Sequence, residues 1–236
     1  MGNLFEKLYT KGENEYNKFL LQKLKSGDKT FIITANPEIF VYSQNDSKIN
    51  EMFHLKETSI VPDGIGVVKA ARKLGIDVKE RITGVDIAVT LLEYCNEYKK
   101  SLYLFGAKQE VIDAMKKVIK EKYSNIELLG ATNGYVKDKD RVMNSIAAKE
   151  PDVTMVALGV PTQEKLIYKH LYKFKKGILI GVGGSFDVIS GLKKRAPKFF
   201  IKTNTEWLYR IIREPKRIKR FWNNNVKFLI NIKKYK

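Results

Sequence analysis

The sequence has a single cysteine, Cys95, among its 236 residues, and only two histidines. One cysteine excludes an internal disulfide and a cysteine-rich zinc site, and its apolar-periodic surroundings predict a small core residue. No run of about 18 apolar residues occurs, so nothing in the sequence predicts a membrane-spanning helix. The first 20 residues also lack the apolar region of a signal peptide. We therefore expect a protein that works inside the cell, either free or held to a membrane from the inside.

Acidic residues are also scarce, because 26 Asp and Glu stand against 44 Lys and Arg, for a net charge of +18. The imbalance is concentrated in residues 192–236, where 15 Lys or Arg meet only Glu206 and Glu214, a net +13. A segment this basic indicates an anionic partner, such as a phospholipid surface, a pyrophosphate group or nucleic acid. The alternative is a solvated face that binds nothing.

Six short apolar runs recur along the chain, and turn residues and amphipathic segments separate them. Runs without polar alternation are typical of buried parallel strands, and repeated strand–helix units predict right-handed crossovers. We therefore predict an α/β fold with a Rossmann-like open, mostly parallel sheet flanked by helices. It would occupy residues 1–191, followed by a basic, aromatic, helical appendage at 192–236. The predicted strands are 31–33, 59–61, 102–105, 126–129, 153–158 and 178–180.

Small and polar residues follow these predicted strands, at the edge where an open parallel sheet binds ligands. Asp63 comes after the second run, and its position is typical both of a helix N-cap and of a general base. The glycine-rich stretch 181–187 lacks the dinucleotide-binding spacing, so it predicts either a tight turn or a phosphate-binding loop. The other residues at this edge are Thr34, Asn36, Gly64, Gly106, Gly134, Gln163, Gly183, Gly184 and Asp187.

Two features that could bind a metal are better explained structurally. Asp138 and Asp140 form a D-x-D pair, but they open a predicted helix, which favours capping and first-turn roles. His54 and His170 have no partners at ligand spacing, so we expect surface or core residues.

The appendage carries four arginines at spacings of three, four and three, which would place them on one face of a helix that Pro215 kinks or restarts. Aromatic residues flank them. Basic residues interleaved with aromatics favour a membrane interface, single-stranded nucleic acid, or a helix that packs its aromatics on the main domain. The arginines are Arg210, Arg213, Arg217 and Arg220.

Short motifs follow one another in order along most of the chain, and each alone is weakly specific. They are T-A-N at 34–36, P-D-G-I-G at 62–66, E-R-I-T-G-V-D at 80–86, L-F-G-A at 104–107, N-G-Y at 133–135, G-V-P-T-Q-E at 159–164, G-V-G-G-S-F-D at 181–187, G-L-K-K-R-A-P at 191–197 and E-W-L-Y-R-I-I-R-E-P-K-R at 206–217. Taken together, from about residue 31 to residue 220, these motifs resemble the WecG/TagA/CpsF family of bacterial glycosyltransferases.

The resemblance implies an inverting transfer from a UDP-sugar to a sugar carried on undecaprenyl diphosphate, without a metal or other cofactor. N-acetylmannosamine would be the donated sugar and N-acetylglucosamine the acceptor, in the synthesis of teichoic acid or another cell-surface polysaccharide. The enzyme would be peripheral on the cytoplasmic face of the bacterial plasma membrane, bound to its anionic surface and not to nucleic acid. The resemblance leaves open another hexose donor and a homo-oligomer. The distant alternative is a nucleic-acid-binding protein.

The resemblance also implies roles for individual residues. Asp63 would deprotonate the acceptor hydroxyl, and Arg81 would offset the charge on the departing UDP. Thr34, Asn36 and Gln163 would line the sugar and diphosphate pocket with Arg81. The nucleotide would lie against Gly106, Tyr135, Gly183, Gly184 and Asp187. The lipid diphosphate or the bilayer would meet Arg210, Arg213, Arg217 and Arg220.

Overall fold

The computed structural model describes residues 4–216, 218–219 and 222–232, and a six-stranded sheet forms its centre in the order β2-β1-β6-β5-β3-β4. Every neighbouring pair of strands is parallel. This confirms the predicted α/β fold and all six predicted strands. The strands are β1 (Thr30–Ala35), β2 (Thr58–Pro62), β3 (Ser101–Gly106), β4 (Glu127–Thr132), β5 (Val153–Ala157) and β6 (Ile178–Gly181).

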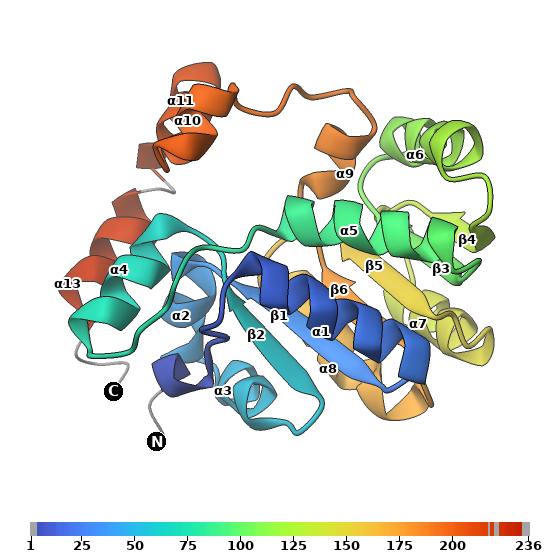
Figure 1. The fold of residues 1–236 in the computed structure, drawn as a ribbon, viewed down its shortest axis with the longest axis horizontal. Helices are drawn as coiled ribbons and strands as arrows, with labels where there is room; N and C mark the ends of the chain where they lie inside the picture. The colour runs from blue at the N-terminus through green and yellow to red at the C-terminus, as the bar shows by residue number, and fades with distance from the viewer. Residues whose placement is uncertain (1–3, 217, 220–221, 233–236) are drawn as a thin grey trace.

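Helices cover both faces of the sheet, as Figure 1 shows. One face carries α1 (Glu13–Ser26), α5 (Gly84–Glu97), α6 (Gln109–Lys122) and α9 (Ser185–Ile189). The other carries η1 (Leu4–Lys7), α2 (Pro37–Ser43), α3 (Ser47–His54), α4 (Ile65–Lys73), α7 (Lys139–Ala148), α8 (Thr162–His170) and η2 (Leu171–Lys173).

Two hydrophobic clusters lie on opposite sides of the sheet, because successive strand residues point to opposite faces. In β1, Phe31 and Ile33 belong to one cluster and Ile32 belongs to the other. The sheet is thus buried on both faces, which explains why its strands are continuous apolar runs rather than alternating ones. Cys95 lies fully buried in the second cluster, as expected of a core residue, and burial raises the pKa of its thiol to about 12.

The appendage, residues 192–236, contains short helices in its described part, as predicted. It contains α10 (Lys198–Lys202), α11 (Glu206–Arg213), a π-helical turn η3 (Trp222–Val226) and α13 (Lys227–Ile230). Its end returns to the main domain, because Phe228 is buried with its ring centroid 6.0 Å from that of Phe5 and 5.4 Å from that of Phe40. Helix α13 contacts α2. The last helix therefore shares the core of the domain.

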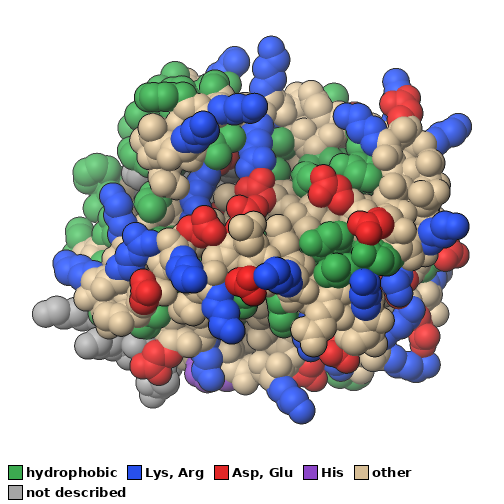
Figure 2. Space-filling model, viewed as in Figure 1, with side chains coloured by type: hydrophobic (Ala, Val, Ile, Leu, Met, Phe, Trp, Pro, Cys, Tyr) green, Lys and Arg blue, Asp and Glu red, His purple; other side chains and the backbone are tan. Residues whose placement is uncertain are grey.

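Apolar side chains also remain on the surface of the appendage. Figure 2 shows hydrophobic side chains gathered at the end of the molecule that α10 and α11 form, with Lys and Arg side chains beside them. In the described part of the chain, no helix combines the length and the apolar character that crossing a membrane requires. The most exposed apolar residues of the appendage are Phe199, Ile212, Trp222 and Ile230.

Candidate active site

Asp63 and Thr34 meet at the carboxyl ends of β2 and β1. The backbone N–H of Asp63 donates to the carbonyl of Ala35 (2.9 Å), which continues the pairing of the two strands beyond their ends. Asp63 Oδ2 accepts a hydrogen bond from the N–H of Gly84, the first residue of α5 (3.4 Å). A Cβ atom at Gly84 would lie 3.4 Å from Thr34 Cγ2 and 3.8 Å from Asp63 Oδ2. A hydroxyl, a carboxylate and a helix N-terminus therefore converge at this point.

The N-cap interpretation of Asp63 is wrong for the helix that follows it. Gly64 occupies the N-cap position of α4, with φ +107° and no side-chain capping bond. The positive φ turns the chain between Asp63 and the helix, a conformation that glycine adopts without strain. Asp63 precedes the cap residue, and its carboxylate faces the first residue of α5, from which it accepts a hydrogen bond.

Asn36 has a clear structural role next to this group. Its side-chain oxygen accepts from the N–H of Ile39 (3.0 Å) and caps α2. The cap holds the first turn of α2 directly after β1. Whether Asn36 also contacts a sugar stays a prediction.

Arg81 is fixed beside the base candidate by backbone pairing. The N–H of Ile82 donates to the carbonyl of Pro62 (2.9 Å), so the chain around residue 81 runs next to the end of β2. The side chain of Arg81 reaches the appendage, where its Nη2 lies 3.1 Å from Oε2 of Glu206 in α11. Both groups are largely buried, with 13% and 8% of the side chains exposed.

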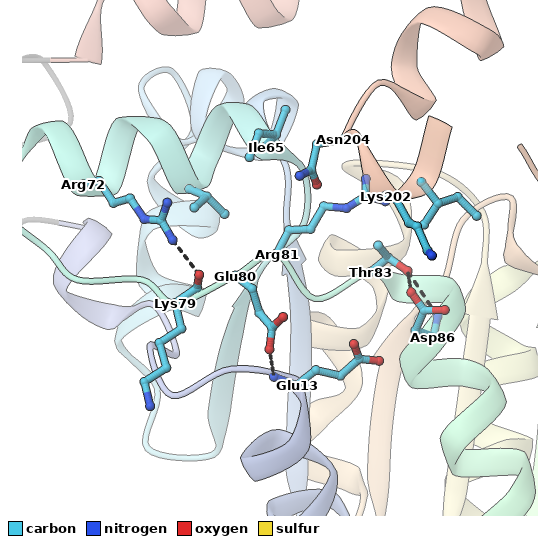
Figure 3. Close-up of a pocket in the computed structure, with 12 residues that line it drawn as sticks. Glu13, Ile65, Arg72, Lys79, Glu80, Arg81, Thr83, Asp86, Lys202 and Asn204 are labelled. Carbon is cyan, nitrogen blue, oxygen red and sulfur yellow. Dashed lines mark hydrogen bonds between the residues drawn. The ribbon is translucent and has the colours of Figure 1, made fainter. Parts of the chain in front are cut away.

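A cavity of about 360 Å³ opens between the α4–α5 segment and α10, and Figure 3 shows its lining. Acidic side chains gather on one part of its wall. Burial is the largest cause that raises the pKa of Glu13 there, and the negative charges of Asp86 and Glu80 add to the rise. Basic side chains form the rest of its charged lining. The charged residues of the wall are Glu13, Arg72, Lys79, Glu80, Arg81, Asp86 and Lys202.

Asp86 organises the start of α5. Thr83 is the N-cap of this helix, and its hydroxyl accepts from the Asp86 N–H (3.2 Å) and donates to Asp86 Oδ2 (2.5 Å). Arg195 of the appendage places Nη2 2.7 Å from Oδ1 and 2.8 Å from Oδ2 of the same carboxylate. The motif at 80–86 is thus tied to the appendage at Arg81 and at Asp86.

Gln163 is buried at the centre of the edge formed by the carboxyl ends of the strands, where its side chain links two loops. Its Oε1 accepts from the N–H groups of Gly159 and Gly183, both at 3.0 Å, and its Nε2 donates to Oε1 of Glu164 (2.8 Å). Both side chains are about 1% exposed. Burial raises the pKa of Glu164 to about 7, and the hydrogen bond from Gln163 opposes that rise. Gln163 therefore shapes the site from within, and a contact with substrate stays a prediction.

The residues expected to hold the nucleotide spread along the edge. Gly183 and Gly184 join β6 to α9, and the Asp187 carboxylate lies 3.3 Å from Lys193 Nζ. Gly106, the last residue of β3, and the exposed Tyr135, after β4, lie farther away, toward the other end of the strand order from Asp63. The expected site residues therefore fall into two groups at this edge of the sheet, one around Asp63 and one at the ends of β3 and β4. Gln163 and Asp187 lie between the two groups.

The arginines of the appendage are only partly described. α11 ends at Arg213, two residues before Pro215, so a single helical face does not extend from Arg210 to Arg220. Arg213 is exposed, and its guanidinium stacks over Tyr209 at 5.7 Å from the ring centroid. The side chain of Arg210, and both Arg217 and Arg220, lie outside what the structure describes.

The acidic pair and the histidines have the predicted structural roles. Asp138 caps α7 by accepting from the N–H of Arg141, and Asp140 lies 2.6 Å from Nε2 of the buried His170. His54 is exposed and bonds to the carbonyl of Asn50 within α3. Within the described ranges, no three His, Cys, Asp or Glu side chains group as metal ligands would.

Comparison with known proteins identifies the family. The family model described as "Glycosyl transferase WecG/TagA/CpsF family" matches residues 7–236. A protein of Bacillus subtilis (strain 168) is 44% identical over 191 residues, 80% of this chain and 73% of the relative. One from Bacillus spizizenii (strain W23) is 40% identical over 190 residues, 80% and 74% of the two chains. One from Staphylococcus aureus (strain MW2) is 36% identical over 197 residues, 83% and 77% of the two chains.

All three relatives are named N-acetylglucosaminyldiphosphoundecaprenol N-acetyl-beta-D-mannosaminyltransferase. The matches favour the enzyme over the nucleic-acid-binding alternative, because the family model that matches residues 7–236 is described as a glycosyl transferase family. The resemblance seen in the motifs is confirmed, and the chain belongs to the WecG/TagA/CpsF family and is a glycosyltransferase.

Proposed function

We propose that this enzyme transfers N-acetylmannosamine from its UDP-sugar to N-acetylglucosamine on undecaprenyl diphosphate, in the assembly of a teichoic acid or related polymer. The observation that carries the proposal is the shared name of three relatives that are 36–44% identical over about four fifths of this chain. That name specifies both the donated sugar and the acceptor.

The arrangement around Asp63 supports a single displacement. Asp63 accepts the proton of the acceptor hydroxyl, whose oxygen attacks the anomeric carbon while the bond from that carbon to UDP breaks. The electron pair of the broken bond leaves with UDP. Attack from the opposite side inverts the anomeric centre, so an α-linked donor gives the β-linkage that the relatives' name specifies.

Arg81 supports the leaving group in this proposal. It stands beside the end of β2 and lines the cavity between the α4–α5 segment and α10. A guanidinium donates up to five N–H bonds in a planar fork that suits phosphate oxygens. Its charge would offset the negative charge that develops on the departing diphosphate without any metal.

The appendage would hold the enzyme at the bilayer. Exposed apolar side chains beside Lys and Arg suit an interface of acyl chains and anionic headgroups. Replacing Ile212 and Trp222 by Ser should therefore weaken binding to vesicles that contain anionic lipid, while thermal stability is kept. Equal binding of the double variant and the unaltered enzyme would contradict this role.

The enzymatic proposal is tested with a panel of UDP-sugars and a short-chain lipid diphosphate that carries N-acetylglucosamine. We expect UDP release and product only with the N-acetylmannosamine donor, unaffected by a metal chelator. Asp63→Asn should lower kcat by roughly 10²–10⁴-fold and leave UDP affinity nearly unchanged. Asp77→Asn, which alters an exposed acid after α4, is the control. Turnover by Asp63→Asn at the control rate would refute the base, and transfer of another hexose alone would refute the donor.

A further inference from the structure

The ion pair between Arg81 and Glu206 links the site to the appendage across 125 residues of sequence. Figure 3 shows the Arg81 side chain running along the cavity toward Asn204 and Lys202 of the appendage. Both partners are mostly buried, so solvent screens the pair less than it screens a surface salt bridge.

Glu206 is unusual for its position in the sequence. It is one of two acids among the 15 Lys and Arg of the appendage. The other acid, Glu214, is 48% exposed and lies 3.9 Å from Lys193. Burial of a carboxylate is unfavourable unless a cation offsets it, and Arg81 is a cation that does so here. A buried acid in so basic a segment therefore points to a specific task at Arg81.

The backbone around Arg81 is fixed on both sides, but its side chain is long. The N–H of Lys79 donates to the carbonyl of Thr10, and that of Ile82 to the carbonyl of Pro62. These backbone bonds do not fix the guanidinium, because several rotatable bonds separate it from the backbone. A carboxylate at 3.1 Å restricts it, and other N–H groups of the same fork can still bind phosphate oxygens.

We propose that Glu206 is a positioning residue of the transfer reaction, which acts by orienting the Arg81 guanidinium toward the diphosphate of the substrate. The inference rests on the function proposed above. It gives the appendage a role in the chemistry through a residue of the main domain, in addition to any contact with lipid.

A second contact makes this role separable from the attachment of the appendage. Arg195 binds the Asp86 carboxylate at 2.7 and 2.8 Å, and Phe228 is buried in the core of the domain. Neither contact involves Glu206. A change at Glu206 is therefore expected to affect Arg81 without releasing the appendage.

The test compares Glu206→Gln with Glu214→Gln in the full chain. Both variants raise the charge of the same segment by one, so Glu214→Gln controls for the effect of charge on vesicle binding. We expect Glu206→Gln to lower kcat by roughly 10- to 100-fold and to weaken UDP binding, since small displacements of a catalytic group have effects of this size. Glu214→Gln should stay within about twofold of the unaltered enzyme, as surface changes do.

A double-mutant cycle shows whether Glu206 acts through Arg81. In the Arg81→Ala background, Glu206→Gln should have no further effect on kcat or on UDP affinity. Additive losses, or equal kcat in the two glutamine variants, would overturn the positioning role. If Glu206→Gln does not fold, Glu206→Asp against Glu214→Asp gives the same comparison, with the charge kept and the carboxylate withdrawn by one methylene.

The outcomes separate the two proposals. An unaltered enzyme that neither binds UDP nor transfers any sugar refutes the proposed function, and the positioning role with it. An active unaltered enzyme without coupling between Arg81 and Glu206 refutes the positioning role alone.

Discussion

Replacing Glu164 by Gln is expected to remove a pH dependence of stability that this one carboxyl group causes between pH 5 and pH 8. Glu164 is about 1% exposed, and its Oε2 is buried without a hydrogen-bond partner among the described residues. Burial raises its pKa from 4.5 to about 7, opposed by the hydrogen bond from Gln163, while the charge of Glu38 adds to the rise. Ionisation of Glu164 therefore opposes folding.

The size of the effect follows from the shift. Between pH 4.5 and about 7 the folded protein keeps the proton that the unfolded chain releases, so stability falls as the pH rises. At about 1.36 kcal/mol per pKa unit, the full shift corresponds to roughly 3 kcal/mol. Most of this is lost between pH 5 and pH 8.

Urea unfolding at pH 5, 6, 7 and 8 measures this loss in the unaltered protein and in Glu164→Gln. The variant should gain roughly 2–3 kcal/mol relative to the unaltered protein from pH 5 to pH 8. A cost of burying the amide that Glu164→Gln introduces would change the free energy of unfolding equally at all four pH values. The prediction therefore concerns only how that free energy changes with pH. Glu121→Gln, at an exposed position of α6, is the control. A constant offset between the two proteins at all four pH values would refute the reasoning.

Two further predictions concern packing. Phe228→Ala should lower the free energy of unfolding by about 3–5 kcal/mol because it empties a core position, whereas Ile230→Ala, at a position 77% exposed, should change it by less than about 0.5 kcal/mol. Equal effects in denaturant titrations would show that α13 does not pack as described. Gly106→Ala should destabilise by about 3 kcal/mol or more, because its Cβ would lie 2.3 Å from the carbonyl oxygen of Ala157. Gly27→Ala, at φ +70° and with open space around it, should cost only about 1 kcal/mol, and a smaller loss at Gly106 than at Gly27 would contradict the close approach.

Local patterns in the sequence were enough to predict the framework. Strands buried on both faces must be continuous apolar runs, and the helices between them must be amphipathic, so each element can be recognised from its own residues. The same holds for the cap at Asp138 and for the core position of Cys95. The carboxyl-end position of Asp63 and Thr34 also follows, because polar residues directly after parallel strands share one edge of the sheet.

The sequence position of Asp63 fitted both a cap and a base, and only the tertiary structure excluded the cap of α4. The choice depended on the backbone of Gly64, whose positive φ gives it the cap position and turns Asp63 toward Gly84. Gln163 presented a similar ambiguity, since spacing alone does not reveal that both bonds to its oxygen come from loops 4 and 20 residues away.

Sequence by itself therefore determined the kind of sheet, the order of its polar residues and the basic character of the appendage, because these depend on neighbouring residues. Only the folded chain decided that Glu206 pairs with Arg81, that Arg195 pairs with Asp86 and that Phe228 enters the core. Those contacts depend on how distant helices pack, and no local periodicity specifies which side chains then meet. The one signal available from the sequence was the presence of two acids, Glu206 and Glu214, in a strongly basic segment. The partner of each acid could be identified only from the three-dimensional structure.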